Sequence, residues 1–474
     1  MSNVHNKKAV RPFFVPIPAN QVILIIKIRK VKNNMPALLK NKETRNKILL
    51  IVALLILIRI GSIIPIPGIN ASYMQQIMSN QGFAFLNMIT GNSMSHMSFF
   101  ALSISPYITA SIIIQLMTTV IPVLEEMTKD GKTGQERIQK ITNMVGILLA
   151  FVQALMLSIG LGNKGLLEPY TWWMVICSTA IWTAGATVLI FIGEKITKLE
   201  LGNGISYILL LNILSTFPGD ILTLYERFIN GQSLPKAAVS AAILFAVISV
   251  LIVICILLNT TETAIPMSFS RKMEGVSKKQ ELPIPLNICS VMPIIFTGSI
   301  FSIPTMIAQF FPGATLFKVI SPFTNQSQWF NPDNIIHTAG CVPYILLTFF
   351  FASFYLEISF NTNELAQNLK SQGATVNGIR PGKPTAEYLH VVASRMAKIG
   401  TTIVIAIILT SVGLCNMSGL AMLSIGGTSM LICVNIIIES SKKLKTASIS
   451  VKNRSRYMKT SRKNRLFIGK GVKK

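Results

Sequence analysis

The chain has 474 residues, of which 51% are hydrophobic and only 13% are charged. Soluble globular proteins contain about 25% charged residues, so this balance excludes an ordinary soluble protein. The formal net charge of +26 would suit nucleic-acid binding, but the basic residues lie in tails and between long apolar stretches, not on one folded surface.

The apolar stretches are long enough to be membrane-spanning helices, which need about 20 residues to cross the hydrocarbon core. No segment alternates often enough to suggest a transmembrane barrel. Spans are predicted at 48–66, 98–122, 141–160, 170–192, 203–217, 237–258, 287–310, 337–359, 399–415 and 420–439. Almost all of the 44 Lys and Arg residues fall on one side of these spans, together with both chain ends. Since Lys and Arg are enriched in cytoplasmic loops, that side is predicted to be the cytoplasm.

The two ends of the chain are predicted to lie outside the membrane. Segment 1–34 is basic and contains several prolines but no small-residue cleavage site, so a peripheral or disordered extension is favoured over a signal peptide. Met35 is an alternative start. The tail 442–474 is rich in Lys and Arg and has no acid. It is predicted to be disordered and to bind anionic lipid, with ribosomal RNA as the alternative.

The first external segment, 68–98, contains no charged residue, yet it is too polar to span the membrane. Within it, 82–89 favours a short half-helix that ends near Thr90. Such an element is tolerated at membrane depth only where protein or a water-filled cavity surrounds it. A surface loop at the lipid interface is the alternative, and composition leaves both open.

Two cytoplasmic loops, 259–286 and 360–398, are longer than helix connections require. They contain Arg271, Lys272 and Arg380, among other basic residues. Long basic loops of this kind favour docking surfaces for a cytosolic partner. The alternative is that these basic residues only reflect the general enrichment of Lys and Arg in cytoplasmic loops.

Residues for catalysis or ion coupling are not found. Gly131-Lys132-Thr133 resembles a phosphate-binding loop, but Glu126 stands where that motif needs a glycine. The Cys and His residues form no metal-binding pattern, so neither an enzyme nor a metal or cofactor site is predicted. Secondary transporters place ionisable groups near the membrane midplane. Here Arg59 and Glu357 lie near span ends, and Arg59 is expected to reach the interface.

Several segments resemble the SecY family of protein-conducting channel subunits. Arg59–Gly68 and Phe100–Leu116 are similar to that family's first two spans. Further similar segments are Gly202–Ser206, Leu282–Phe296, Asn361–Leu369, Gly378–Gly382, Thr385–Tyr388 and Gly426–Ser429. The resemblance covers about 35–445 in the family's order and spacing.

The resemblance implies an all-α polytopic membrane protein, with ten transmembrane helices in two inverted five-helix halves around a central pore. The halves would be 35–217 and 218–441. The waist of the pore would be a ring of aliphatic side chains: Ile104, Ile108, Ile205, Leu209, Ile295 and Ile432. An apolar constriction excludes water and ions by dewetting.

A plug below the ring is implied at about 82–98, with Phe83, Phe85, Leu86, Met88 and Ile89 as its apolar residues. A lateral gate is implied between spans 2–3 and 7–8. Gln115 and Asn287 match polar gate positions. Facing amides would hold the gate shut by about 1 kcal/mol, which an apolar signal helix can overcome.

The implied function is the central channel subunit of the Sec translocase, which passes unfolded preproteins and releases apolar segments into lipid. A SecA motor or the ribosome would dock on the cytoplasmic loops, at Arg271, Lys272 and Arg380. A SecE-type subunit, and further a SecG-type subunit, would brace the channel. A bacterial plasma membrane is the expected location, with a plastid-type membrane as the alternative. An accessory channel for restricted clients and a secondary transporter remain alternative functions.

Overall fold

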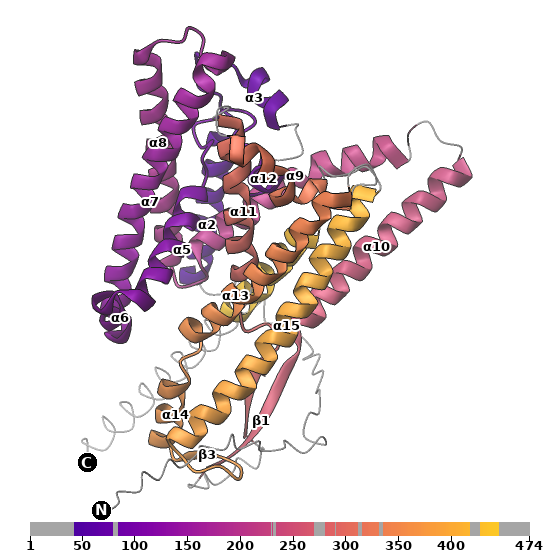
Figure 1. The fold of residues 1–474 in the computed structure, drawn as a ribbon. Coiled ribbons are helices and arrows are strands. Elements are labelled where there is room, and N and C mark those ends of the chain that lie inside the picture. Colours follow the sequence, from indigo (N-terminus) through magenta and orange to yellow (C-terminus); the bar gives the residue numbers. More distant parts are fainter. Residues whose placement is uncertain are drawn as a thin grey trace, which may run out of the picture.

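The computed structural model describes residues 42–78, 84–228, 230, 234–269, 280–289, 291–310, 315–330, 335–417 and 427–444. These residues form a helical bundle with a small β-sheet at one end (Figure 1). The predicted extension 1–34, the alternative start Met35 and most of the tail lie outside the described residues. Phe83, Arg271 and Lys272 also lie outside them.

Each of the ten predicted spans overlaps a helix. The first half contains α2 (Lys42–Gly61), α3 (Ala71–Met78), α4 (Ala84–Thr90), α5 (Ser105–Val120), α6 (Pro122–Lys129), α7 (Gly131–Leu161), the π-helical turn η3 (Gly162–Leu166), α8 (Trp172–Thr197) and α9 (Gly204–Phe228). The second half contains α10 (Leu234–Thr260), β1 (Glu262–Phe269), β2 (Gln280–Pro285), α11 (Met292–Phe310), α12 (Thr315–Thr324), η4 (Gln326–Gln328), η5 (Ile335–Gly340), α13 (Cys341–Ser359), α14 (Thr362–Ser371), β3 (Ala374–Val376), α15 (Lys383–Met417) and a final helix at 427–444. Among the described residues, six helices are long and apolar enough to cross a membrane, or seven if a bent pair is one span.

The bent pair is α5 and α6, which meet at an angle of 103°. Ile121 has an extended backbone between them, because the residue before a proline avoids helical angles and Pro122 follows. At the other end, residues 98–104 form turns rather than the start of the predicted span 98–122, and Ser103 has a φ of +52°. The second span is therefore shorter than predicted.

The two long loops, 259–286 and 360–398, are joined by a three-stranded antiparallel sheet with the order β2-β1-β3. Strand β1 pairs with β2 from its own loop and with β3 from the other, with Met267 opposite Val376. In Figure 1 this sheet and α14 lie beside the lower part of α15. The apolar side chains of Ile265, Ile284 and Leu389 form a separate small core there. The two loops are thus one folded unit.

Helix α15 continues well outside the predicted span 399–415, since its 35 residues begin inside the loop 360–398. At its far end, Asn416 donates hydrogen bonds to the backbone carbonyls of Gln326 (2.8 Å) and Trp329 (2.6 Å). The helix therefore joins the sheet unit to the opposite end of the bundle.

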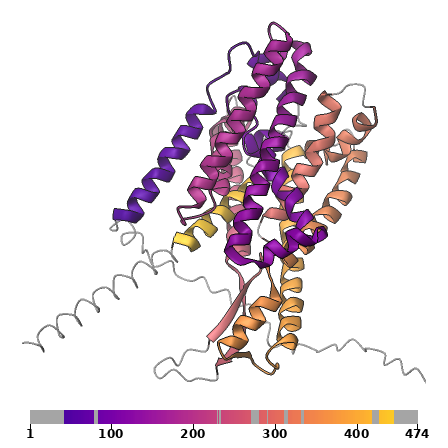
Figure 2. The same ribbon diagram turned by 90° about the vertical axis from the view of Figure 1, so that its left-hand side faces the viewer.

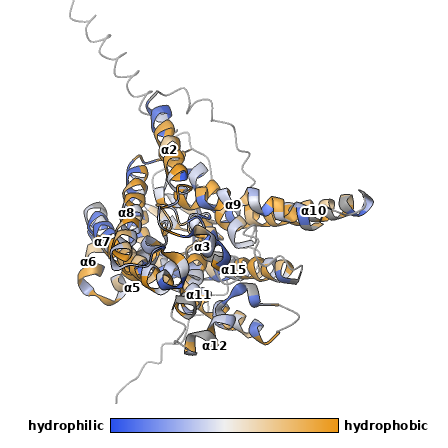
Figure 3. Ribbon diagram, turned by 90° about the horizontal axis from the view of Figure 1, so that it is seen from above, coloured by the Kyte–Doolittle hydropathy of each residue, from blue (hydrophilic) through white to orange (hydrophobic). Residues whose placement is uncertain are grey.

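Helices α10 and α2 are among those with large apolar side chains exposed on their surface. Helix α10 reaches away from the other helices (Figure 3), and Phe245 and Val239 on it are 76% and 60% exposed. Helix α2 lies at an edge of the bundle (Figure 2), where Leu49 and Ile60 are also mostly exposed. Surfaces of this kind are stable in lipid or against a membrane-embedded partner.

The main core lies where the two halves meet. Helices α5, α7, α8 and α9 pack in series, as do α11, α13 and α15, and α11 contacts both α5 and α7 across the middle. The largest hydrophobic cluster combines side chains of both halves, for example Ile108 on α5 and Ile295 on α11. The candidate site lies within this cluster.

Candidate functional site

The six residues predicted to form a ring all belong to this central cluster, although they come from four separate segments of the chain. Ile104 and Ile108 lie at the start of α5 and Leu209 lies on α9. Ile295 lies on α11 and Ile432 on the last helix. These five are buried, with at most 8% of the residue exposed.

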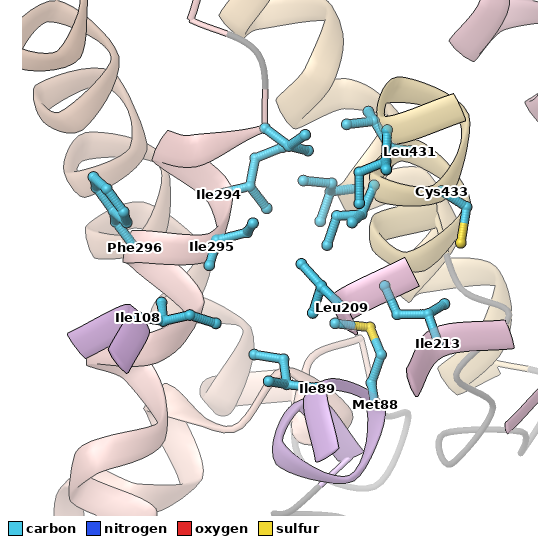
Figure 4. Close-up of a cluster of buried hydrophobic side chains, with 14 of the residues drawn as sticks. Met88, Ile89, Ile108, Leu209, Ile213, Ile294, Ile295, Phe296, Leu431 and Cys433 are labelled. Atoms are coloured by element: carbon cyan, nitrogen blue, oxygen red, sulfur yellow. The ribbon is translucent and has the colours of Figure 1, made fainter. Parts of the chain in front are cut away.

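Figure 4 shows how the labelled side chains converge. Ile108, Leu209 and Ile295 point toward a common centre from three different helices. Every side chain labelled in this view is apolar. A packed aliphatic centre excludes water, because apolar side chains offer it no hydrogen-bond partner.

Ile205 differs from the other five. It is half-buried, and its Cδ1 atom lies over Gly193 of α8, where an added Cβ would be only 2.5 Å away. Ile205 therefore packs at the border between the cluster and α8, and Leu209, one turn later, lies closer to the centre. Asn203 directly precedes α9. Its side-chain oxygen accepts a hydrogen bond from the Ile205 backbone amide at 3.0 Å and so caps the start of the helix.

The short half-helix expected near 82–89 is present as α4. Met88 and Ile89 belong to the same cluster as the ring residues and are almost fully buried. In Figure 4 they rise from α4 toward Leu209. Leu86 is also buried, but it packs in a second cluster within the first half. Phe85 belongs to α4 as well.

Arg59 was expected to reach the membrane interface, and in the structure its side chain forms hydrogen bonds within the protein. Its guanidinium donates hydrogen bonds of 3.2 Å to the Ser62 hydroxyl and to the Gly91 carbonyl just after α4. Sequence reasoning also missed Asn212 and Ser215 on α9, which contact the same end of α4. Their only sequence signal is that polar residues stand on the otherwise apolar start of α9.

The two amides at the candidate gate do not bond to each other, so that expectation is wrong for this conformation. Gln115 donates to Ser111 Oγ at 3.0 Å, and its Oε1 atom is buried without a partner. Asn287 donates to Asn259 Oδ1 at 2.8 Å. The reason is local, because each amide finds a partner on its own side of the boundary. Across the boundary α11 instead contacts both α5 and α7, and its contact with α5 is apolar, as between Ile295 and Ile108.

A chain of polar groups ties α5, α7 and α8 together. Gln139 donates to Tyr107 Oη (3.0 Å) and to Asn143 Oδ1 (2.9 Å), and Asn143 donates to Glu194 at 3.1 Å. Lys198, just after α8, pairs with Glu194 at 2.8 Å. That hydrogen bond raises the pKa of the Lys198 ammonium group. These helices are thus fastened to one another as one side of the boundary.

Arg380, the expected docking residue, is exposed in the turn between β3 and α15. Gly378 and Gly382 on either side have φ of +80° and +105°, which glycine adopts without strain. The Thr385 hydroxyl donates to the Arg380 carbonyl at 2.8 Å and fixes the turn onto α15. Among the described residues, no carboxylate forms an ion pair with Arg380.

The fold and this site define a multi-pass α-helical membrane protein whose halves meet at an apolar centre that contacts a short helix. The family model for SecY matches residues 98–441. The chain belongs to the SecY family.

Known relatives and structures agree with this assignment. The protein translocase subunit SecY of Staphylococcus carnosus is 32% identical over 418 residues, which are 85% of this chain and 94% of that protein. The same subunit of Streptococcus gordonii is 31% identical over 423 residues, with 85% and 94% covered. A solved protein conducting channel superposes with a TM-score of 0.62 at 18% identity, covering 84% of this chain and 91% of that chain. Sec61 from a canine ribosome-channel complex superposes with a TM-score of 0.59 at 17% sequence identity, also covering 84% of this chain and 91% of that chain.

Proposed function

We propose that this chain is the central channel subunit of a Sec-type protein translocase. It passes unfolded polypeptides across a membrane and releases apolar segments sideways into lipid. The observation that best supports this proposal is the central aliphatic cluster. Ile108, Leu209 and Ile295 come from three helices in both halves, and they are buried together in contact with α4. Membership of the SecY family supports the same function.

The aliphatic cluster is the seal and the waist of the pathway. Side chains without hydrogen-bonding groups hold back water and ions by dewetting. They also give a passing peptide no fixed polar partner that would hold it in place. A seal made of Leu209, Ile295 and Ile432 therefore suits cargo of varied sequence, and it needs no substrate-specific site.

Helix α4 is the plug. Met88 and Ile89 fill the space beside Leu209 when the channel is at rest. The segment around α4 carries no charge, so moving it costs no ionic desolvation. Displacement of α4 opens the route that its side chains occupy.

The lateral gate is the contact of α5 and α7 with α11. Because the α5 side of this contact is apolar, an apolar signal helix can replace it with packing of similar strength. Gln115 and Asn287 flank the contact and bond on their own sides. Each Leu or Ile of a client segment then favours lipid modestly, and each charge opposes release.

The energy for transport comes from a partner on the sheet unit. Arg380 is the docking residue, since its planar guanidinium pairs bidentately with carboxylate or phosphate. The partner is a SecA-type motor or the ribosome. A SecE-type subunit, with a SecG-type subunit as a further one, covers exposed apolar side chains such as those of α2.

The location follows from charge and from the exposed apolar surface. The basic side of the chain, with both ends, faces the cytoplasm of a bacterium, and α10 lies in the plasma membrane. A plastid-type membrane has the same polarity and is the alternative.

Depletion of this protein in its own cells tests the function. A secreted precursor is followed by pulse labelling while the chain is removed. Accumulation of many uncleaved precursors within about one generation is expected if it is the general channel. If most export continues and the chain co-purifies with a SecE-type subunit, it is an accessory channel with few clients. Continued export without such a subunit contradicts the proposal.

A further inference from the structure

Helix α4 ends with backbone carbonyls that its own helix does not satisfy. The last four carbonyls of any helix lack an intrahelical donor, and α4 has only seven residues. The Thr90 carbonyl accepts from the Ser93 hydroxyl at 2.7 Å, within the same segment. The carbonyls of Ile89 and Gly91 receive side-chain donors from other helices instead.

Asn212 on α9 supplies the first of these donors. Its Nδ2 atom lies 2.7 Å from the Ile89 carbonyl oxygen and 2.8 Å from the Ser103 hydroxyl oxygen, so both amide protons are used. Asn212 is only 4% exposed, and Ser103 is buried too. A buried amide whose two protons bond to different segments fixes the position of those segments relative to each other.

Gly91 supplies the second contact. Its carbonyl accepts from Arg59 Nη1 on α2 at 3.2 Å. It also lies 3.2 Å from Ser215 Oγ on α9, whose single proton is shared with the Asn212 carbonyl at 2.6 Å. Gly91 has a φ of +62°, and an added Cβ would lie 2.8 Å from the Asn212 Cα atom. The chain turn after α4 is therefore pressed directly against the backbone of α9.

We infer that Asn212, together with Ser215 and Arg59, is a latch that holds the C-terminal end of α4 and sets how readily α4 is displaced. This inference rests on the proposed function, in which α4 is the plug. Asn212 is a positioning residue for α4. The latch is releasable, because each carbonyl that leaves it can be rehydrated in an opened pathway.

The latch acts at the base of α4, away from the aliphatic packing of Met88 and Ile89. The seal and the latch are then separate controls. Aliphatic side chains set how well the closed channel excludes water, whereas polar contacts at Gly91 and Ile89 set how often it opens. Replacement of Asn212 with an apolar residue of similar size should change opening and leave the ring intact.

The test uses the full chain with Met88→Cys as a reporter, since residue 88 is 4% exposed while α4 is seated. Because the native Cys177 and Cys415 are only partly buried, labelling of the same chain without the reporter is subtracted in each case. Labelling by a membrane-impermeant maleimide is timed in membranes, first without and then with Asn212→Leu. Loss of the Asn212 donor leaves the buried Ile89 carbonyl without a partner. The labelling rate is therefore expected to rise on the order of tenfold. Ser215→Ala removes one of the two donors to Gly91 and should give a smaller rise.

Asn143→Leu is the matched control, because Asn143 is a similarly buried amide that bonds Glu194 rather than α4. Its labelling rate should not change. Equal rates in Asn212→Leu, Ser215→Ala and the parent overturn the latch. A rise of the same size in Asn143→Leu also overturns it, since the effect would then be general loosening.

This outcome is separate from that of the proposed function. A raised labelling rate, together with normal export after depletion and no co-purifying SecE-type subunit, keeps the latch and removes the channel assignment. Blocked export together with unchanged labelling keeps the channel and removes the latch. If Asn212→Leu fails to accumulate, Ser215→Ala alone decides, and an unchanged rate there refutes the inference.

Discussion

The Ser429 hydroxyl donates a hydrogen bond of 2.8 Å to the thioether sulfur of Met88, and the two residues are 341 positions apart in the chain. Ser429 lies near the start of the last helix, and Met88 lies on α4. The contact joins α4 to the second half, whereas the Asn212 contact joins it to the first. Helix α4 is thus held by both halves at once.

Ser429→Ala should loosen this hold slightly. Because a thioether is a weak acceptor, loss of this hydrogen bond should cost about 0.5–1 kcal/mol. The equilibrium constant for displacement of α4 should then rise a few-fold. Ion conductance of the resting channel in a planar bilayer measures it. An increase as large as that from a ring substitution would show that the hydroxyl does more than contact Met88.

Leu209→Ser should make the resting channel conduct ions, because a hydroxyl lets water enter the aliphatic centre. Ile205→Ser should conduct less, since Ile205 packs at the border with Gly193. Ile176→Ser is the matched control on the outer surface, where Ile176 is 57% exposed, and no conductance is expected from it. Unchanged conductance in Leu209→Ser contradicts the seal.

Gln115→Leu and Asn287→Leu should affect stability in opposite directions. Gln115 Oε1 is buried without a partner, so a leucine removes an unsatisfied acceptor and should raise or preserve the melting temperature. Asn287→Leu leaves Asn259 Oδ1 without its donor and should cost about 1–2 kcal/mol. Thermal unfolding of the purified protein in detergent compares the two. A lower melting temperature for Gln115→Leu alone would show that its amide is needed.

Arg380→Glu should weaken binding of the cytosolic partner by about tenfold to a hundredfold, the loss expected for a charge-assisted pair. Arg380→Lys should recover only part of it, because lysine cannot bind bidentately. Precursor export and partner binding to membranes are both measured. Lys370→Glu, on the exposed side of α14, is the charge-matched control. Equal losses in both variants would mean that net charge, rather than Arg380, governs docking.

Gly91→Ala should unseat α4. Alanine at a φ of +62° costs about 1 kcal/mol, and its Cβ would also meet the Asn212 Cα atom at 2.8 Å. Gly378→Ala separates the two effects, because Gly378 has a φ of +80° with open space around it. Resting conductance should rise only in Gly91→Ala. A similar rise in both variants would mean that contact with α9 is unimportant.

The sequence predicted those parts of the fold that depend on local composition. Each apolar stretch overlaps a helix, and six or seven of the described helices could cross a membrane. For the segment around α4, composition left a half-helix and a surface loop open, and the structure shows the half-helix. Resemblance to SecY picked ring residues such as Leu209, and the structure brings all six into one cluster. Their role as a ring remains a proposal.

Features that depend on contacts between distant segments were not predictable from local composition. Pairing of Met267 with Val376 joins two loops that no pattern in either loop connects. In the sequence Asn212 is an isolated polar residue in a span, and only the fold shows that it bonds to the end of α4. Gln115 and Asn287 were expected to face each other because they match polar gate positions of the SecY family, yet each forms its hydrogen bond with a partner on its own side.

Helix α15 has a mechanical consequence. At about 1.5 Å per residue its 35 residues measure about 52 Å, well beyond the hydrocarbon thickness of about 30 Å. One end is tied to the turn of Arg380 and the other, through Asn416, to Trp329. A helix of this length behaves as a stiff lever arm. A load applied at the turn would therefore tilt the far end directly, and no relay of side-chain rearrangements along the bundle is required.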